Sequence, residues 1–222
     1  NTAVGVDSLK LNTTASNNTA FGAYTLDANT TGDRNVAIGW AALSDNVAGD
    51  RSTAVGFAAL QTQNPSSNAD MYNTAVGYNA GNAITTGVRN TAVGGLSLDA
   101  NTTANDNTAI GYNSLTTNTT GASNTAVGKG SLSDNSTASN NTAVGFNSLN
   151  LNTTGLQQVA FGSEALDANT TGNYNAAFGH GSLGSNTTAD YNTAIGTYAL
   201  TANTTGAENV AVGANAGDAN TT

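Results

Sequence analysis

Few residues of this 222-residue chain could take part in catalysis or bind a metal. It has one histidine, His180, no cysteine, and fourteen carboxylates scattered along the sequence. Disulfides, thiolate metal sites and cysteine nucleophiles are therefore excluded, and acid–base chemistry has little material. Asp27, Asp99, Asp167 and Asp218 recur at one place in a repeating pattern, but the calcium-type nonapeptide G-G-x-G-x-D is absent. We predict no catalytic residues, no metal site and no cofactor, and hence that the protein is not an enzyme.

Aromatic residues offer a candidate binding site of a different kind. They follow an invariant glycine at one position of the pattern, which varies freely and so faces outward: Trp40, Phe57, Tyr78, Tyr112 and Phe146, with His180 in the same column. An exposed row of aromatic rings can bind glycans or a protein surface. The alternative is that these rings only stack on one another, or contact a second copy of the chain.

A recurring Asn-Thr-Thr motif has three readings. It matches the N-glycosylation pattern N-x-[ST], it is typical of turns, and asparagines stacked along an axis can form an amide ladder. We favour the ladder, because a turn alone would accept Asp or Gly more often, and an inward asparagine cannot carry a glycan. The predicted ladder comprises Asn12, Asn29, Asn46, Asn101, Asn118, Asn135, Asn152, Asn169, Asn186, Asn203 and Asn220.

The composition excludes several classes of partner. Thr (36), Asn (34) and Gly (26) dominate, whereas charged residues make up 9%, against about 25% in an average domain. Lys and Arg number only five and the net charge is −9, which argues against binding nucleic acid or an anionic lipid surface. No apolar run reaches the roughly 18 residues of a membrane span, so we expect no membrane insertion of this segment.

The elements that must position these residues follow from a repeat. An apolar residue followed by Gly recurs with Gly at 5, 22, 39, 56, 77, 94, 111, 128, 145, 162, 179, 196 and 213, and eleven of the twelve intervals are 17 residues. The consensus is N-T-A-V-G-x-x-S-L-x-x-N-T-T-G-x-x, numbered here as positions 1–17 from Asn1. A fixed short period is the signature of a solenoid.

Seventeen residues are too few for a helix–turn–helix unit, and β-branched and turn-forming residues disfavour helix. We therefore predict an all-β fold, a parallel β-solenoid (β-roll or β-helix) of about 13 coils, continuous over residues 1–222. Neither end carries an atypical cap, so we expect an excerpt of a longer rod, or ends that stack on other molecules.

Variation at each position predicts which side chains form the core. Position 4 is always Val, Ile or Phe, and we expect it to point inward, together with position 2 on the same face of a strand. Position 9 is Leu in eleven copies and predicts a second core column. Positions 3 and 5 are always Ala and Gly. By alternation we expect them to form an outward packing face for other copies of the chain (Ala3, Gly5, Ala20, Gly22, Ala37 and Gly39). The alternative is a tight corner that admits only small residues.

One interval is 21 residues long. The coil from Ser52 to Tyr72 contains the only Pro and the only Met, Pro65 and Met71. We predict that residues 61–72 form an inserted surface loop, since insertions in solenoids map to loops on one face. A binding role for this loop is the less favoured interpretation.

The repeat unit N-T-A-V-G-x-x-S-L-x-x-N-T-T-G resembles the NTAVG/NTAIG-type repeats of bacterial surface proteins and phage tail-fibre proteins. It is also similar to the head-domain β-rolls of trimeric autotransporter adhesins, whose repeats carry a strand ending in A-I-G. The resemblance covers the whole chain and implies an extracellular rod or stalk, with adhesion as a common role. It implies no catalytic residues.

We therefore predict a structural protein that forms an extracellular, cell-surface or virion-surface fibre by coil stacking and association with copies of itself, possible trimers included. The main alternative is an adhesin or tail-fibre segment that binds a surface receptor or glycan. A third is an ice-binding protein. Strict alternation would put Thr13 and Thr14 on opposite faces, leaving one exposed threonine column per corner, and this weakens the third hypothesis.

Overall fold

The computed structural model describes all residues, 1–222, and every regular element in it is a β-strand. None of these residues forms a helix long and apolar enough to cross a bilayer. Thirteen strands are three residues long and occur once per coil: β1 (Thr2–Val4), β2 (Thr19–Phe21), β3 (Val36–Ile38), β5 (Thr53–Val55), β7 (Thr74–Val76), β8 (Thr91–Val93), β9 (Thr108–Ile110), β10 (Thr125–Val127), β11 (Thr142–Val144), β12 (Val159–Phe161), β13 (Ala176–Phe178), β14 (Thr193–Ile195) and β15 (Val210–Val212). Two further strands have two residues each, β4 (Gly49–Asp50) and β6 (Ala69–Asp70).

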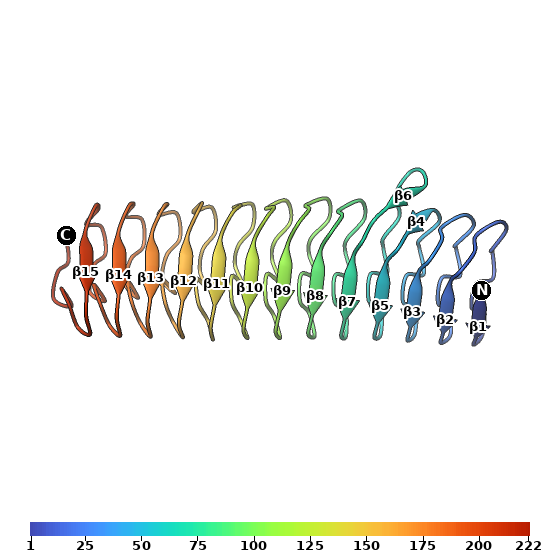
Figure 1. Cartoon of the computed structure of the whole chain (residues 1–222), viewed down its shortest axis with the longest axis horizontal. Helices are drawn as coiled ribbons and strands as arrows, with labels where there is room; N and C mark the ends of the chain where they lie inside the picture. The colour runs from blue at the N-terminus through green and yellow to red at the C-terminus, as the bar shows by residue number, and fades with distance from the viewer. The chain divides into compact units, whose positions relative to one another are not determined.

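The chain divides into two compact units, residues 1–107 and 108–222. In the first, β1, β2, β3, β5, β7 and β8 pair in that order, and in the second β9 to β15 pair in sequence order. All pairs are parallel, and equivalent residues of successive coils face each other, as Thr2 faces Thr19 (Figure 1). The predicted parallel β-solenoid with 17-residue coils is confirmed.

The coil is turned by residues in the left-handed region of backbone space. Non-glycine residues at positions 7, 9 and 17 have φ between 48° and 62°, for example Tyr24, Leu26 and Arg34. This conformation costs roughly 1–2 kcal/mol per residue, so it persists only where the surroundings impose it. At position 9 the imposing factor is burial, because the leucine side chain there is almost completely removed from solvent.

The prediction of which strand face forms the core is wrong. Alanine at position 3 is buried in every coil except the terminal Ala3, whereas position 4 is exposed or half-buried throughout. Position 2 likewise faces solvent. The strand T-A-V therefore directs Ala inward and Thr and Val outward, and Ala3, Ala20 and Ala37 do not belong to an outward packing face.

The room available inside the coil explains this inversion. Leucines at position 9 are buried as predicted, and they enter the interior from another wall. A Cβ atom added at Gly217, which occupies position 9, would lie 3.9 Å from the Ala211 methyl group. Position 9 thus faces position 3, and a large side chain on one wall leaves space for only a methyl group on the other.

Glycine at position 5 is required by the backbone, so Gly5, Gly22 and Gly39 are not a packing face either. These glycines have φ between 126° and 145°, which other residues rarely adopt. A Cβ atom at Gly5 would lie 2.2 Å from the carbonyl oxygen of Gly22, one coil further on. The alternative interpretation, a corner that admits only the smallest residue, is the correct one for position 5.

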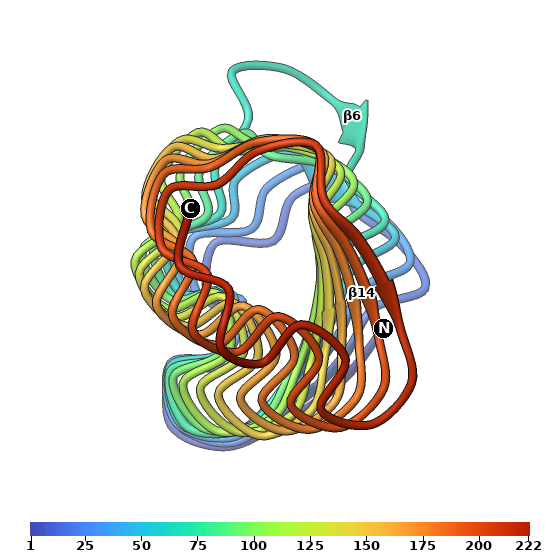
Figure 2. The same cartoon turned by 90° about the vertical axis from the view of Figure 1, so that its left-hand side faces the viewer.

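The long coil pairs with both neighbouring coils through β5, and its additional residues form a loop that projects from the solenoid. Strand β6 pairs with β4, and the loop that carries β6 stands out from the coil in Figure 2. Asn64, Ser66, Ser67 and Asn68 are exposed, but Gln63 and Met71 are buried. The surface loop predicted over 61–72 therefore has both of its ends anchored in the interior.

Candidate functional site

A ladder of buried asparagines runs along the inside of the coil at position 12. In the first unit Asn46 Nδ2 donates to Asn29 Oδ1 over 3.2 Å. In the second unit each amide donates to the one before it, over 2.9–3.4 Å, through Asn118, Asn135, Asn152, Asn169, Asn186 and Asn203. The same Nδ2 atoms also donate to a carbonyl three residues on, as Asn152 does to Gly155. In the second unit the coils from Asn118 to Asn203 are thus joined to one another by polar contacts shielded from water. In the first unit Ile84 replaces the asparagine of one coil, and the Oδ1 atoms of Asn12 and Asn203, toward the two ends of the chain, have no partner.

The ladder asparagines are not needed for a left-handed backbone, since none of them has a positive φ. They serve the corner through their side chains, which bond the carbonyl three residues on, and the ladder through their contacts with the neighbouring coil. Burial of Asn29, Asn101, Asn152 and Asn203 also removes these amides from enzymes that would attach a glycan. The asparagine of the Asn-Thr-Thr motif is therefore an interior hydrogen-bonding element in this chain.

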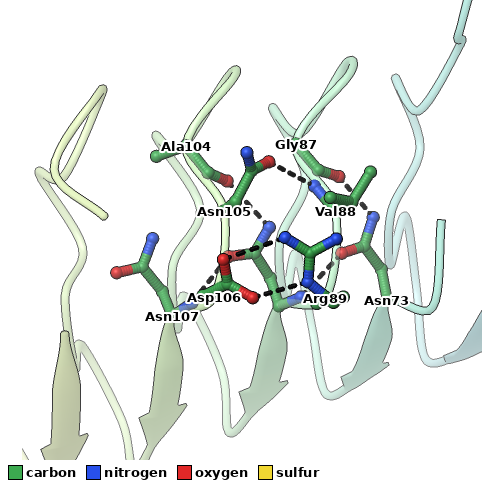
Figure 3. A network of polar contacts seen from close by, with 9 residues as sticks. Asn73, Gly87, Val88, Arg89, Ala104, Asn105, Asp106 and Asn107 are labelled. Carbon is green, nitrogen blue, oxygen red and sulfur yellow. Dashed lines mark hydrogen bonds and ion pairs between the residues drawn. The ribbon is translucent and has the colours of Figure 1, made fainter. Parts of the chain in front are cut away.

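A second column of amides, at position 1, was missed by the sequence analysis. Asn73 Oδ1 accepts the backbone N–H of Asn90, one coil on, over 2.9 Å, while Asn73 Nδ2 donates to the Gly87 carbonyl over 2.7 Å (Figure 3). Asn90 repeats both contacts with Asn107 and Ala104. The signal was available, since position 1 is Asn in eleven of thirteen coils and Ser52 or Gln158 in the others.

The two exceptional residues of the long coil compensate for each other. Ser52 is too short to replace an asparagine at position 1, and Gln63 stands where the ladder asparagine would be. Gln63 Oε1 accepts from Asn73 Nδ2 over 2.9 Å and contacts the Ser52 hydroxyl at 3.1 Å, while its Nε2 donates to Asn46 Oδ1 over 3.1 Å. One longer amide thus connects both columns across the interrupted coil.

The outward columns at positions 2 and 4 form the most apolar surface of each unit. The exposed members of position 4 are Val4, Phe21, Ile38 and Val76 in the first unit and Ile110, Phe161, Phe178, Ile195 and Val212 in the second. Position 2 supplies Thr, Val or Ala, and neither column contains a charged residue. Phe161 and Phe178 stack with ring centroids 6.4 Å apart. We call positions 2 and 4 together the apolar face.

The aromatic residues at position 6 are exposed, as predicted, and most of them stack along the chain axis. In the first unit the ring centroids of Trp40 and Phe57 are 4.6 Å apart and those of Phe57 and Tyr78 are 5.5 Å apart, with nearly parallel planes. In the second unit Tyr112 and Phe146 are exposed, and the Lys129 ammonium lies 5.7 Å from the Phe146 ring centroid. Stacking covers both faces of Phe57 and one face each of Trp40 and Tyr78.

Two threonine columns face outward at the Asn-Thr-Thr corner, in contrast to the prediction of one. These residues lie in bends between strands, where strict alternation does not apply. In the second unit position 14 is exposed Thr in six successive coils (Thr120, Thr137, Thr154, Thr171, Thr188 and Thr205). At position 13 each hydroxyl donates to the carbonyl of the next coil, as Thr153 Oγ1 does to Thr170 over 2.9 Å.

The titratable residues do not form a catalytic or metal-binding cluster. No group of three or more His, Asp or Glu side chains could hold a metal ion, and the surface has no pocket. His180 contacts the Ser163 carbonyl at 3.0 Å and the Tyr198 hydroxyl at 2.9 Å. Burial raises the pKa of Asp27, and burial together with the nearby Glu164 raises the pKa of Asp167.

Two of the three ion pairs on the surface involve an arginine at position 17. Arg89 and Asp106 form a two-pronged pair with N–O distances of 2.6 and 3.0 Å (Figure 3). The Arg89 guanidinium lowers the pKa of the Asp106 carboxyl. Arg51, at the end of the preceding coil, pairs with Asp70 of the long coil and lies 5.7 Å from the Tyr72 ring centroid. These ion pairs join neighbouring corners. Each arginine is neutralised by a carboxylate, so the two pairs do not form a charged binding site.

Comparison of the chain with protein families, characterised proteins and solved structures gave no significant match.

Proposed function

We propose that this chain is a non-enzymatic structural protein, a segment of an extracellular or surface fibre that associates side by side with copies of itself through the apolar face. The observation that carries the proposal is the row of apolar side chains at position 4, which are exposed in nine of the thirteen coils and half-buried in the other four. Exposed apolar stripes of this kind mark interaction surfaces. Because these side chains are already about half covered within the chain, burying the rest of one contributes on the order of 1 kcal/mol.

The distribution of charge supports self-association. The chain carries a net charge of −9, yet positions 2 and 4 hold no charged residue in any coil. Two copies that meet on this face therefore place only threonine and apolar side chains in the contact. Sheets pack face to face at about 10 Å with interdigitated side chains, and a column with one side chain per coil suits that arrangement.

The experiment is analytical ultracentrifugation of the chain and of two matched variants. The double substitution Phe161→Glu and Phe178→Glu places carboxylates on the apolar face, and we expect association to weaken at least about tenfold, since like charges would be buried at the contact. Leu156→Glu is the control, because Leu156 is exposed and apolar but lies at position 16, outside this face. A wild-type monomer, or equal association of all three proteins, would refute the proposal.

Adhesion through the aromatic residues at position 6 has weaker support. Sugar rings pack on the faces of aromatic side chains, whereas stacking covers both faces of Phe57 and one face each of Trp40 and Tyr78. The proposal instead assigns these rings to the edge of the self-association surface, since position 6 follows position 4 after a single glycine. Alanine substitutions of the three rings that abolish binding to cells or glycans, with the fold intact, would favour the adhesin hypothesis.

Ice binding is a second candidate, because both threonine columns of the second unit face outward. Successive coils place equivalent oxygens about 4.8 Å apart, and the hydrogen bonds of position 13 fix those hydroxyls along the axis. Thermal hysteresis that is lost in Thr154→Lys and kept in Leu156→Lys would support this function. The absence of hysteresis in the wild-type chain would exclude it.

A further inference from the structure

Two tyrosines of successive coils form a parallel stacked pair on the surface of the second unit. The ring centroids of Tyr174 and Tyr191 are 4.9 Å apart and their planes differ by 3°. The two residues are 46% and 56% exposed, respectively. No other tyrosine ring contacts a second tyrosine ring. Tyr24, Tyr78 and Tyr198 each contact a ring of another residue type.

The backbone beneath the pair holds the two rings together. Both residues occupy position 17 with φ near 58° (57° and 59°), and Tyr191 N–H donates to the Asn173 carbonyl over 3.1 Å. One residue earlier, Asp190 Oδ1 accepts the Asn173 backbone N–H over 2.6 Å. Two hydrogen bonds at adjacent residues therefore join the corners that carry the rings. The two phenols lie side by side in the folded chain without any rearrangement of the backbone.

We propose that Tyr174 and Tyr191 are a site of oxidative dityrosine coupling, which would join two successive coils covalently. The co-reactant is a one-electron oxidising system, such as hydrogen peroxide with a haem peroxidase. Each phenol loses one electron and one proton, and the two phenoxyl radicals join through the ring carbons next to the oxygen. The hydrogens on those carbons then move to the phenol oxygens as aromaticity returns, so that two hydrogens are lost overall and the peroxide is reduced to two waters.

The pair favours coupling within one molecule over coupling between molecules. Reacting groups held side by side behave as if at an effective concentration far above that of the protein in solution, about 10⁵–10⁸ M in well-oriented cases. The ring centroids are 4.9 Å apart and the planes are nearly parallel. Bond formation requires the two exposed rings to turn about their side-chain torsions until the carbons next to the phenol oxygens meet.

The product would restrain the solenoid where it otherwise has no covalent cross-link. The chain has no cysteine, so apart from the polypeptide backbone itself its coils are held together by non-covalent contacts. A bond between Tyr174 and Tyr191 closes a loop of 17 residues (191 − 174), and a closed loop restricts the unfolded chain.

The test is treatment of the full chain with peroxidase and hydrogen peroxide at low protein concentration, followed by cleavage before aspartate. Cleavage before Asp167, Asp190 and Asp218 places the two tyrosines on separate fragments, 167–189 and 190–217. We expect mass spectrometry to find these fragments joined, lighter by two hydrogens than their sum, with fragmentation that assigns the bond to Tyr174 and Tyr191.

The variants Tyr174→Phe and Tyr191→Phe keep the stacked ring and remove the phenol, so the fold should be retained and the joined species should fall at least about tenfold. Tyr198→Phe is the control, because Tyr198 lies on fragment 190–217 and should leave the yield unchanged. Coupling that persists in Tyr191→Phe, or is spread evenly over all seven tyrosines, would overturn the proposal. So would the absence of coupling in the wild-type chain under conditions in which a tyrosine peptide couples.

Discussion

Replacing Asn152 by alanine tests whether the interior amide ladder stabilises the solenoid. Asn152 Nδ2 donates to Asn135 Oδ1 over 3.0 Å and to the Gly155 carbonyl over 2.9 Å, and Asn152 Oδ1 accepts from Asn169 Nδ2 over 2.9 Å. All three contacts are buried and disappear in the variant.

The magnitude follows from what each partner retains. The Gly155 carbonyl still accepts from Asn141 Nδ2 over 2.9 Å, so its loss is small. Asn135 Oδ1 keeps one long contact of 3.4 Å to Asn141, and one N–H of Asn169 loses its partner. A buried polar group left fully unsatisfied costs about 1–3 kcal/mol, and the weakened Asn135 Oδ1 adds a smaller loss. The two together should lower the free energy of unfolding by about 2–4 kcal/mol.

The assay is thermal and urea unfolding followed by circular dichroism, with hydrogen exchange to locate the change, because repeat proteins can open coil by coil. A loss of 2 kcal/mol or more corresponds to a fall in Tm of at least about 4 °C for a chain of this size. Exchange should accelerate most in the backbone amides of the coils that contain Asn135, Asn152 and Asn169.

Thr154→Ala is the matched control, two residues away but exposed, and its effect should stay within about 0.5 kcal/mol of wild type. If Asn152→Ala is equally mild, the ladder contributes nothing measurable and asparagine at position 12 has some other role.

Three further predictions concern the core, the long coil and pH. Ala143→Val should lower the free energy of unfolding by about 1–3 kcal/mol through overpacking, whereas Val144→Thr, on the outward side of the same strand, should be nearly neutral. Urea denaturation compares the two variants. A larger loss for Val144→Thr would contradict the assignment of alanine to the core and valine to the surface. Gln63→Ala should cost about 2 kcal/mol or more because it removes the bridge between both amide columns, and hydrogen exchange at Asn46 and Asn73 would report it. Because the pKa of Asp167 is raised in the folded state, the unfolded chain ionises first, and stability should fall as pH rises from about 4 through the raised pKa. Asp167→Asn should therefore raise Tm at neutral pH and leave it unchanged below that window, with Asp134→Asn as an exposed control; equal pH profiles for wild type and Asp167→Asn would contradict the assignment.

The sequence by itself determined the period, the fold class and two of the interior columns. Three features of the sequence each have one physical interpretation in a stacked coil. They are the regular spacing of Gly, the eleven leucines at position 9 and the recurring asparagine at position 12. Stacking places every residue beside its own equivalent, so a side chain that satisfies itself along the axis can be recognised from repetition alone. The asparagine column at position 1 obeys the same logic and could have been recognised in the same way.

Only the tertiary structure decided which side of the short strands faces inward. Alternation in T-A-V shows that Ala lies opposite to Thr and Val, but a three-residue strand does not show which side is the core, and hydrophobicity alone favoured valine. The interior is so narrow that leucine from the facing wall and the asparagine ladder fill it, and only a methyl group fits beside them. The apolar face therefore lies on the outside because the interior has too little volume for its side chains. That volume depends on the distance between the walls of the folded coil, which the sequence of a single repeat does not specify.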